Sequence, residues 1–150
     1  MKRILLAFLL VGFVQAAQAQ LNPVTWTFSA KKISDKTYEV QLKATIQAKW
    51  HLYSQSQPED AIAIPTAFVF SPNPLFTLQG KVKETGKMEK YTDKTLGVSA
   101  NQYSNTVMFT QVVKLKGNVK TSITGNVEYQ TCDDEKCLPP KKVNFKVALD

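Results

Sequence analysis

Apolar and polar residues alternate along most of this chain with a period of two, the pattern of a β-strand with one buried face. The clearest run spans residues 38–46, in which every second residue is apolar: Tyr38, Val40, Leu42, Ala44 and Ile46. Shorter runs of this kind occupy residues 24–28, 75–83, 106–115, 121–131 and 143–149, and a short aromatic run and a short apolar run, residues 50–53 and 67–70, are also predicted to be strands. After residue 19 no stretch has a helical period, so the chain is predicted to be all-β.

The spacing of these runs predicts the architecture. About seven to nine short strands within about 130 residues are typical of an immunoglobulin-like antiparallel β-sandwich. Gly80 interrupts one run and predicts a bulge or a bend there. Residues 86–100 are polar, rich in lysine and without a clear period, and we predict that they form a long loop, with strand ends flanking it as the alternative to a loop throughout.

The first 19 residues have the features of a secretory signal peptide. Lys2 and Arg3 give a positive start, residues 4–14 are almost wholly apolar, and residues 17–19 are Ala-Gln-Ala. The apolar run is shorter than the roughly 20 residues of a membrane-spanning helix. We expect cleavage after this segment and export of a single domain, residues 20–150, with an uncleaved anchor as the alternative.

Charge and composition restrict the partners of the exported domain. The chain has 19 basic and 12 acidic residues, and Arg3 is its only arginine. Because arginine is the side chain that reads guanine and clamps phosphate, this composition argues against a nucleic-acid partner. The lysines are scattered along the sequence and indicate a soluble surface.

The only two cysteines, Cys132 and Cys137, lie between two strand-like runs. A short turn between the strands can bring the sulfurs within bonding distance. A disulfide closing so short a loop stabilises a fold by only about 2 kcal/mol on the chain-entropy model. A domain of 150 − 19 = 131 residues hardly needs it, which favours a redox role over a structural one. Lys136 adjoins Cys137 and favours its thiolate, which predicts that Cys137 is the more nucleophilic of the two.

Other chemistries have little support in the sequence. His51 is the only histidine, and the sequence has neither a zinc-type spacing nor a glycine-rich phosphate loop. A copper site made of His51, Cys132 and Cys137 is the third reading of the cysteines, after redox exchange and a structural bond. We expect no cofactor.

Two segments resemble the N-terminal periplasmic domain of the thiol:disulfide interchange protein DsbD. Residues 129–132, Tyr-Gln-Thr-Cys, and residues 137–140, Cys-Leu-Pro-Pro, resemble the active-site hairpin of that family. Residues 50–54, Trp-His-Leu-Tyr-Ser, resemble its aromatic segment. The spacer between the cysteines is one residue shorter than in the best-known members. The similarity extends over roughly residues 24–149.

This resemblance implies an immunoglobulin-like sandwich with redox cysteines on a hairpin, in the periplasm. Cys137 would form the mixed disulfide with a partner, and Cys132 would resolve it. The family also shields its disulfide with a cap loop, and residues 93–97 occupy the corresponding place here. They keep the Asp and Gly of that loop but lack its aromatic tip. The residues expected to line the site or its cap are Tyr53, Tyr91, Asp93, Leu96 and Tyr129.

The function implied is that of an exported thiol:disulfide oxidoreductase. It would accept electrons from a thioredoxin-like donor or a membrane electron conduit. It would pass them to thioredoxin-like partners such as disulfide isomerases or cytochrome c maturation thioredoxins, and act as a monomer. The alternative is a non-catalytic β-sandwich used for binding or assembly, with a structural hairpin disulfide.

Overall fold

The computed structural model describes residues 21–150, so the predicted signal peptide lies outside the described residues. The described part consists of nine strands joined by turns and loops. These are β1 (Val24–Ser34), β2 (Thr37–Ile46), β3 (His51–Tyr53), β4 (Ala67–Phe70), β5 (Phe76–Asp93), β6 (Val98–Leu115), β7 (Thr121–Tyr129), β8 (Thr131–Cys132) and β9 (Lys141–Leu149). Within residues 21–150 no helical segment has the length and hydropathy that a membrane crossing requires.

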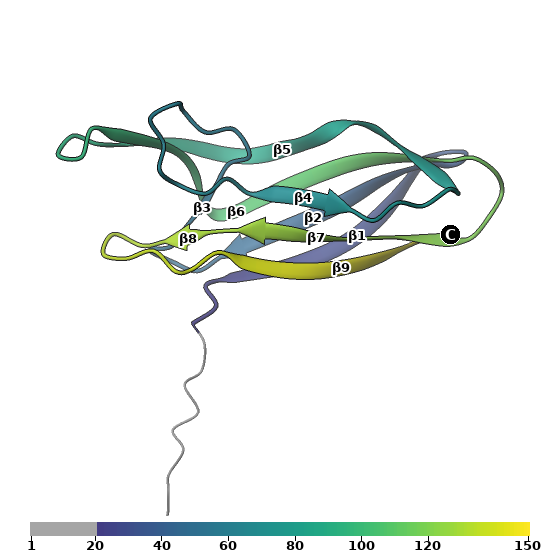
Figure 1. Cartoon of the computed structure of the whole chain (residues 1–150). Coiled ribbons are helices and arrows are strands. Elements are labelled where there is room, and N and C mark those ends of the chain that lie inside the picture. Colours follow the sequence, from purple (N-terminus) through teal and green to yellow (C-terminus); the bar gives the residue numbers. More distant parts are fainter. Residues whose placement is uncertain (1–20) are drawn as a thin grey trace, which may run out of the picture.

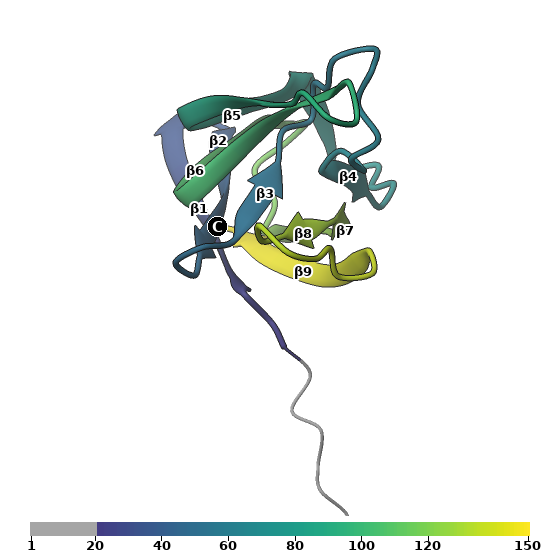
Figure 2. The same cartoon turned by 90° about the vertical axis from the view of Figure 1, so that its left-hand side faces the viewer.

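The strands form two antiparallel sheets that face each other (Figures 1 and 2). The larger sheet has the order β1-β2-β6-β3-β8, and β5 pairs with the opposite edge of β6. The smaller sheet has the order β4-β7-β9. This all-β sandwich confirms the predicted fold class.

The core lies between the sheets and follows the period of two seen in the sequence. In β2 the residues from Tyr38 to Ile46 that were expected on one face are all buried. From β6, Phe109 is fully buried and packs against Phe68 of β4, with ring centroids 5.0 Å apart. Trp26 of β1 lies 5.8 Å from the Phe109 ring, so these three aromatic rings join the two sheets.

Two changes of partner place the cysteine hairpin at one end of the sandwich. Strand β6 pairs with β2 from Thr106 to Lys114. On the N-terminal side of Asn105, it pairs with β3 instead. Asn105 has a φ of 63°, which marks the break between these two pairings. The chain itself crosses from the smaller sheet to the larger one at Gln130, between β7 and β8. The β5–β6 turn and the turn after β8 therefore lie at the same end of the molecule (Figure 1).

The prediction of a long loop over residues 86–100 is wrong. Strand β5 continues to Asp93 and β6 already begins at Val98, so most of this segment is a hairpin. Most of its β5 residues are exposed on both faces, and such a strand needs no alternation of apolar residues. The prediction for Gly80 is confirmed, since its φ is 71° and the β5–β6 register shifts between Gln79 and Lys83.

Candidate functional site

The two cysteines close a tight hairpin. Cys132, at the end of β8, pairs with Cys137 through an isolated antiparallel bridge, and their Cα atoms are 4.0 Å apart. The backbone N–H of Asp133 donates a 2.9 Å hydrogen bond to the carbonyl oxygen of Lys136 and closes the turn. The two sulfurs are joined in a disulfide, as the spacing in the sequence predicted.

Asp133 stabilises the turn between the cysteines. Its Oδ1 accepts hydrogen bonds from the backbone N–H groups of Glu135, at 2.9 Å, and Lys136, at 2.8 Å. These bonds favour the charged carboxylate and lower the pKa of Asp133 below its ordinary value. One of the acidic residues next to the cysteines therefore has a structural role.

The two cysteines differ in their exposure. Cys132 is buried, with 4% of its surface accessible, whereas Cys137 is exposed. Thiol–disulfide exchange requires that the incoming sulfur reach one sulfur of the pair. The exposed Cys137 is the member that a partner protein can reach.

Gln130 braces the hairpin at the point where the chain changes sheets. Its Nε2 donates to the carbonyl oxygen of Leu138 at 3.3 Å, and its Oε1 accepts from the backbone N–H of Ile64 at 3.2 Å. The side chain thus ties the residue after Cys137 to the loop that precedes β4. The glutamine of the Tyr-Gln-Thr-Cys segment therefore has a structural role, which is to hold the cysteine hairpin against this loop.

Tyr53 lies beside the cysteine hairpin, at the end of β3. It is 8% exposed, and its carbonyl oxygen accepts a 2.6 Å hydrogen bond from the Thr66 hydroxyl. Burial, and secondarily the charge of Tyr91, raise the pKa of Tyr53 above its ordinary value. The phenol is therefore neutral at physiological pH.

Residues 93–97, the cap loop, form the β5–β6 turn. Oδ1 of Asp93 accepts hydrogen bonds from the backbone N–H groups of Thr95, at 2.8 Å, and Leu96, at 3.0 Å. The N–H of Gly97 donates to the carbonyl oxygen of Asp93 at 2.8 Å, and Gly97 has the positive φ, 67°, that such a turn requires. Asp93 therefore organises its own loop, and Leu96 is left 67% exposed at the tip.

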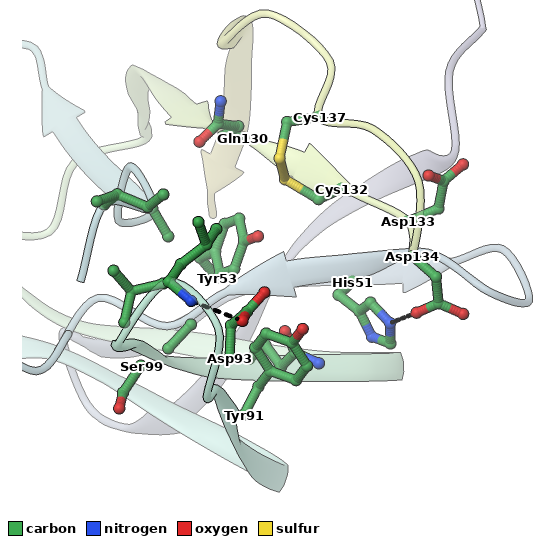
Figure 3. A pocket seen from close by; sticks show the side chains of 16 residues that line it. His51, Tyr53, Tyr91, Asp93, Ser99, Gln130, Cys132, Asp133, Asp134 and Cys137 are labelled. Atoms are coloured by element: carbon green, nitrogen blue, oxygen red, sulfur yellow. Dashed lines mark hydrogen bonds and ion pairs between the residues drawn. A yellow bond between two sulfur atoms is a disulfide. The ribbon is translucent and has the colours of Figure 1, made fainter. Parts of the chain in front are cut away.

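A pocket of about 320 Å³ separates the cap loop from the cysteine hairpin (Figure 3). It is bounded by the two hairpins, by the end of β3 and by the loop before β4. Its lining residues are His51, Tyr53, Ile62, Ala63, Tyr91, Asp93, Leu96, Val98, Ser99, Ala100, Gln102, Gln130, Cys132, Asp133, Asp134 and Cys137.

Most of the residues expected at the site line this pocket. Both cysteines are there, together with Tyr53 and three residues of the cap hairpin, Tyr91, Asp93 and Leu96. Tyr129 is not: it is 2% exposed and lies in the core, with its ring centroid 5.5 Å from that of Trp26.

Sequence reasoning missed several other lining residues. Ile62, Gln130 and Asp134 come from loops and turns in which no periodic pattern exists. The place of Gln130 in the motif before Cys132 could have identified it as a site residue, whereas no sequence feature pointed to Ile62. Within residues 21–150 no three His, Cys, Asp or Glu side chains come together as a metal site would require.

The fold and the site together define an immunoglobulin-like domain that carries a disulfide, one cysteine exposed and one buried, on a hairpin at the end of its sandwich. Residues 18–149 match the family model described as thiol:disulfide interchange protein DsbD, N-terminal. The match covers nearly the whole chain, which therefore belongs to this family. The resemblance seen in the sequence is confirmed. No curated protein matches the chain.

Two solved structures of a DsbD N-terminal domain and one of an ScsB domain have the same fold. The reduced DsbD N-terminal domain of Neisseria meningitidis is 17% identical, with a TM-score of 0.53, over 83% of this chain and 86% of that chain. The DsbD domain in a complex with the PilB N-terminal domain, from the same organism, is 16% identical with a TM-score of 0.54, over 87% and 88%. The N-terminal periplasmic domain of ScsB from Proteus mirabilis is 14% identical with a TM-score of 0.52, over 85% of this chain and 45% of that chain.

Proposed function

We propose that this chain is an exported thiol:disulfide oxidoreductase that works through Cys132 and Cys137 in the periplasm. The observation that carries the proposal is the disulfide itself, with an exposed Cys137 and a buried Cys132 beside an open pocket. A purely structural bond needs neither an exposed cysteine nor a pocket. Membership of the DsbD N-terminal family supports the same chemistry.

The reaction uses the two cysteines in turn. The Cys137 thiolate attacks a partner disulfide, so that one sulfur of the partner leaves and a mixed disulfide forms. Cys132 then attacks Sγ of Cys137, which releases the partner as a dithiol and restores the Cys132–Cys137 bond. Two electrons pass to the partner, and a thioredoxin-like or membrane-bound donor must return them.

The partners we propose are thioredoxin-like proteins. The solved complex of a DsbD N-terminal domain with a PilB N-terminal domain supports a protein partner for this fold. The apolar Ile62 and Leu96, both largely exposed at the rim of the pocket, suit contact with another protein surface.

The equilibrium reduction potential of the Cys132–Cys137 pair tests this proposal. We expect a value above about −300 mV, the level below which structural disulfides usually lie. The oxidised fraction would be measured by alkylation after equilibration in thiol buffers of known potential at pH 7. A potential far below that level would make the bond a structural one and would move the search for function to the surface of the sandwich.

The cap loop is expected to limit access to the disulfide. Asp93→Ala removes the acceptor of two hydrogen bonds that shape the loop. Because each such bond contributes about 1 kcal/mol, and the two together about 2 kcal/mol, we expect dithiothreitol to reduce the disulfide up to about 30-fold faster in this variant. The initial rate of reduction under excess dithiothreitol is the measurement.

Asp35→Ala is the matched control for this prediction. Asp35 is an exposed aspartate in the β1–β2 turn. The adjoining end of β2 pairs with Lys114 of β6, at the opposite end of that strand from the cap loop, so Asp35 is distant from the loop. Its removal should leave the rate of reduction unchanged. Equal rates in all three proteins would show that the loop does not shield the disulfide.

A further inference from the structure

His51 is the cross-strand neighbour of the buried cysteine. It begins β3, and in the β3–β8 pair it lies directly opposite Cys132. Side chains of directly opposite residues in an antiparallel pair project from the same face, with Cβ atoms about 4.5–5.5 Å apart. Both residues line the pocket, where Figure 3 shows the imidazole close to the cysteine hairpin.

Hydrogen bonding fixes the tautomer of this imidazole. The Ser104 hydroxyl donates to Oε2 of Glu89 at 3.0 Å and lies 3.1 Å from Nδ1 of His51. A hydroxyl whose proton is given to a carboxylate can only accept from the ring, so Nδ1 carries the proton in neutral His51. Nε2 is then unprotonated and available as a base.

The unprotonated nitrogen faces the hairpin that carries the cysteines. Nε2 of His51 lies 3.8 Å from Oδ1 of Asp134, within the turn between Cys132 and Cys137. Asp134 can accept a hydrogen bond from Nε2 only after that nitrogen gains a proton. The site therefore has a partner ready for the charged imidazolium.

Cys132 needs such a base more than Cys137 does. The resolving step requires a thiolate, and a cysteine that is 4% exposed has little contact with solvent bases that could take its proton. Lys136, which favours the Cys137 thiolate, adjoins Cys137 and not Cys132. Within the pocket lining, His51 is the only imidazole.

We propose that His51 is the base that activates Cys132 for the resolving step, an inference that rests on the proposed thiol–disulfide exchange. Nε2 takes the proton of the Cys132 thiol, and the thiolate attacks Sγ of Cys137 in the mixed disulfide. The Cys132–Cys137 bond forms as the bond between Cys137 and the partner breaks. The partner leaves as a thiolate and takes up a proton, which the His51 imidazolium or water supplies.

Several ionisable groups act on this imidazole. Asp134 faces it directly, and Glu89 acts through Ser104. The other ionisable groups of the pocket lie on the cap hairpin, on β3 and in the turn after Cys132. Those groups are Asp93, Asp133, Tyr53 and Tyr91.

The test separates the two thiol steps in time. Reduced protein is mixed with one equivalent of dithiobis(nitrobenzoate), and release of the coloured thiolate is followed by stopped flow between about pH 5 and 9. The first phase reports attack by Cys137, and the second reports attack by Cys132 on the resulting mixed disulfide. In His51→Gln we expect the second phase to be about 10²-fold slower at pH 7 and to lose its change of rate in the range where imidazole titrates. The first phase should stay as in the unsubstituted protein.

Asp134→Asn gives an independent test at a position whose side chain is 88% exposed. It removes the partner of the imidazolium, so the pH at which the second phase changes should move to lower values. Glu135→Gln is the matched control, because it removes a neighbouring carboxylate outside the pocket lining, and it should leave that pH in place.

Different results separate this inference from the proposed function. An unchanged second phase in His51→Gln, or equal slowing of both phases, would overturn the role of His51 and leave the exchange activity standing. No shift in Asp134→Asn would also count against it. If the unsubstituted protein releases only one equivalent of the coloured thiolate, Cys132 does not resolve the mixed disulfide, the cysteines do not act as an exchanging pair, and both proposals fail.

Discussion

Cys137→Ser should abolish thiol–disulfide exchange while the domain stays folded. Serine cannot form the mixed disulfide, so reduction of a thioredoxin-like disulfide substrate should fall at least about 10³-fold. The substitution also removes the Cys132–Cys137 bond, which closes a short loop and stabilises the fold by only about 2 kcal/mol. That loss is small beside the 5–15 kcal/mol of stability typical of a domain.

Cys132→Ser is the matched control, because it breaks the same disulfide and leaves the exposed thiol of Cys137. This variant should form a mixed disulfide with a partner and fail to release it, so that the covalent complex accumulates on a non-reducing gel. Activity and trapping would be measured together with the thermal unfolding of both variants. If both lose their fold to the same degree, the bond is structural and the non-catalytic reading of the sandwich gains.

The two variants are expected to behave differently because Cys132 is buried and Cys137 is exposed. The sequence could indicate this difference in exposure only indirectly. Lys136 next to Cys137 predicted the more nucleophilic cysteine, and the exposure of Cys137 agrees with that choice. The burial of Cys132 could not be predicted locally, because it packs against Tyr53 of β3 and Ala100 of β6, which are distant in sequence.

The fold was predictable wherever one face of a strand is buried. The alternation in residues 38–46 identified β2 almost to the residue, and the short apolar run 67–70 identified β4. The same rule could have placed Tyr129, which shares a face of β7 with the buried Ile123 and Val127. Tyr129 was assigned to the site because it is close to Cys132 in the sequence. The face of β7 on which Tyr129 lies was not considered.

Alternation did not reveal the end of β5, because solvent contacts both faces of this strand. The β5–β6 hairpin extends past the smaller sheet (Figure 1), and the polar, lysine-rich sequence of β5 has no period to detect. The pocket depends on this hairpin, because Tyr91, Asp93 and Leu96 come from it. Only the resemblance to a family with a cap loop pointed to these residues, and the pairing of β5 with β6 brings them opposite the cysteines.

Phe109→Ala should cause a large loss of stability, because it truncates one of the largest fully buried side chains of the core. Phe109 is fully buried and its ring centroid lies 5.0 Å from that of Phe68 and 5.8 Å from that of Trp26, so it connects β6 to both β4 and β1. Truncating such a residue leaves a cavity between the sheets and costs about 3–5 kcal/mol. The midpoint of thermal unfolding should fall by about 10–20 °C.

Val69→Ala is the control for this prediction, because Val69 lies next to Phe68 on β4 but is 59% exposed. It should cost less than about 1 kcal/mol, and an equal loss in both variants would contradict the assigned core.

Phe109 is also distant from the redox site. It lies 109 − 102 = 7 residues along β6 from Gln102 of the pocket, about 23 Å at 3.3 Å per residue. The protein that remains folded in Phe109→Ala should therefore keep the reduction potential of the Cys132–Cys137 pair. A changed potential would mean that the cysteine hairpin depends on packing far from it, and that the redox site and the core of the sandwich are coupled.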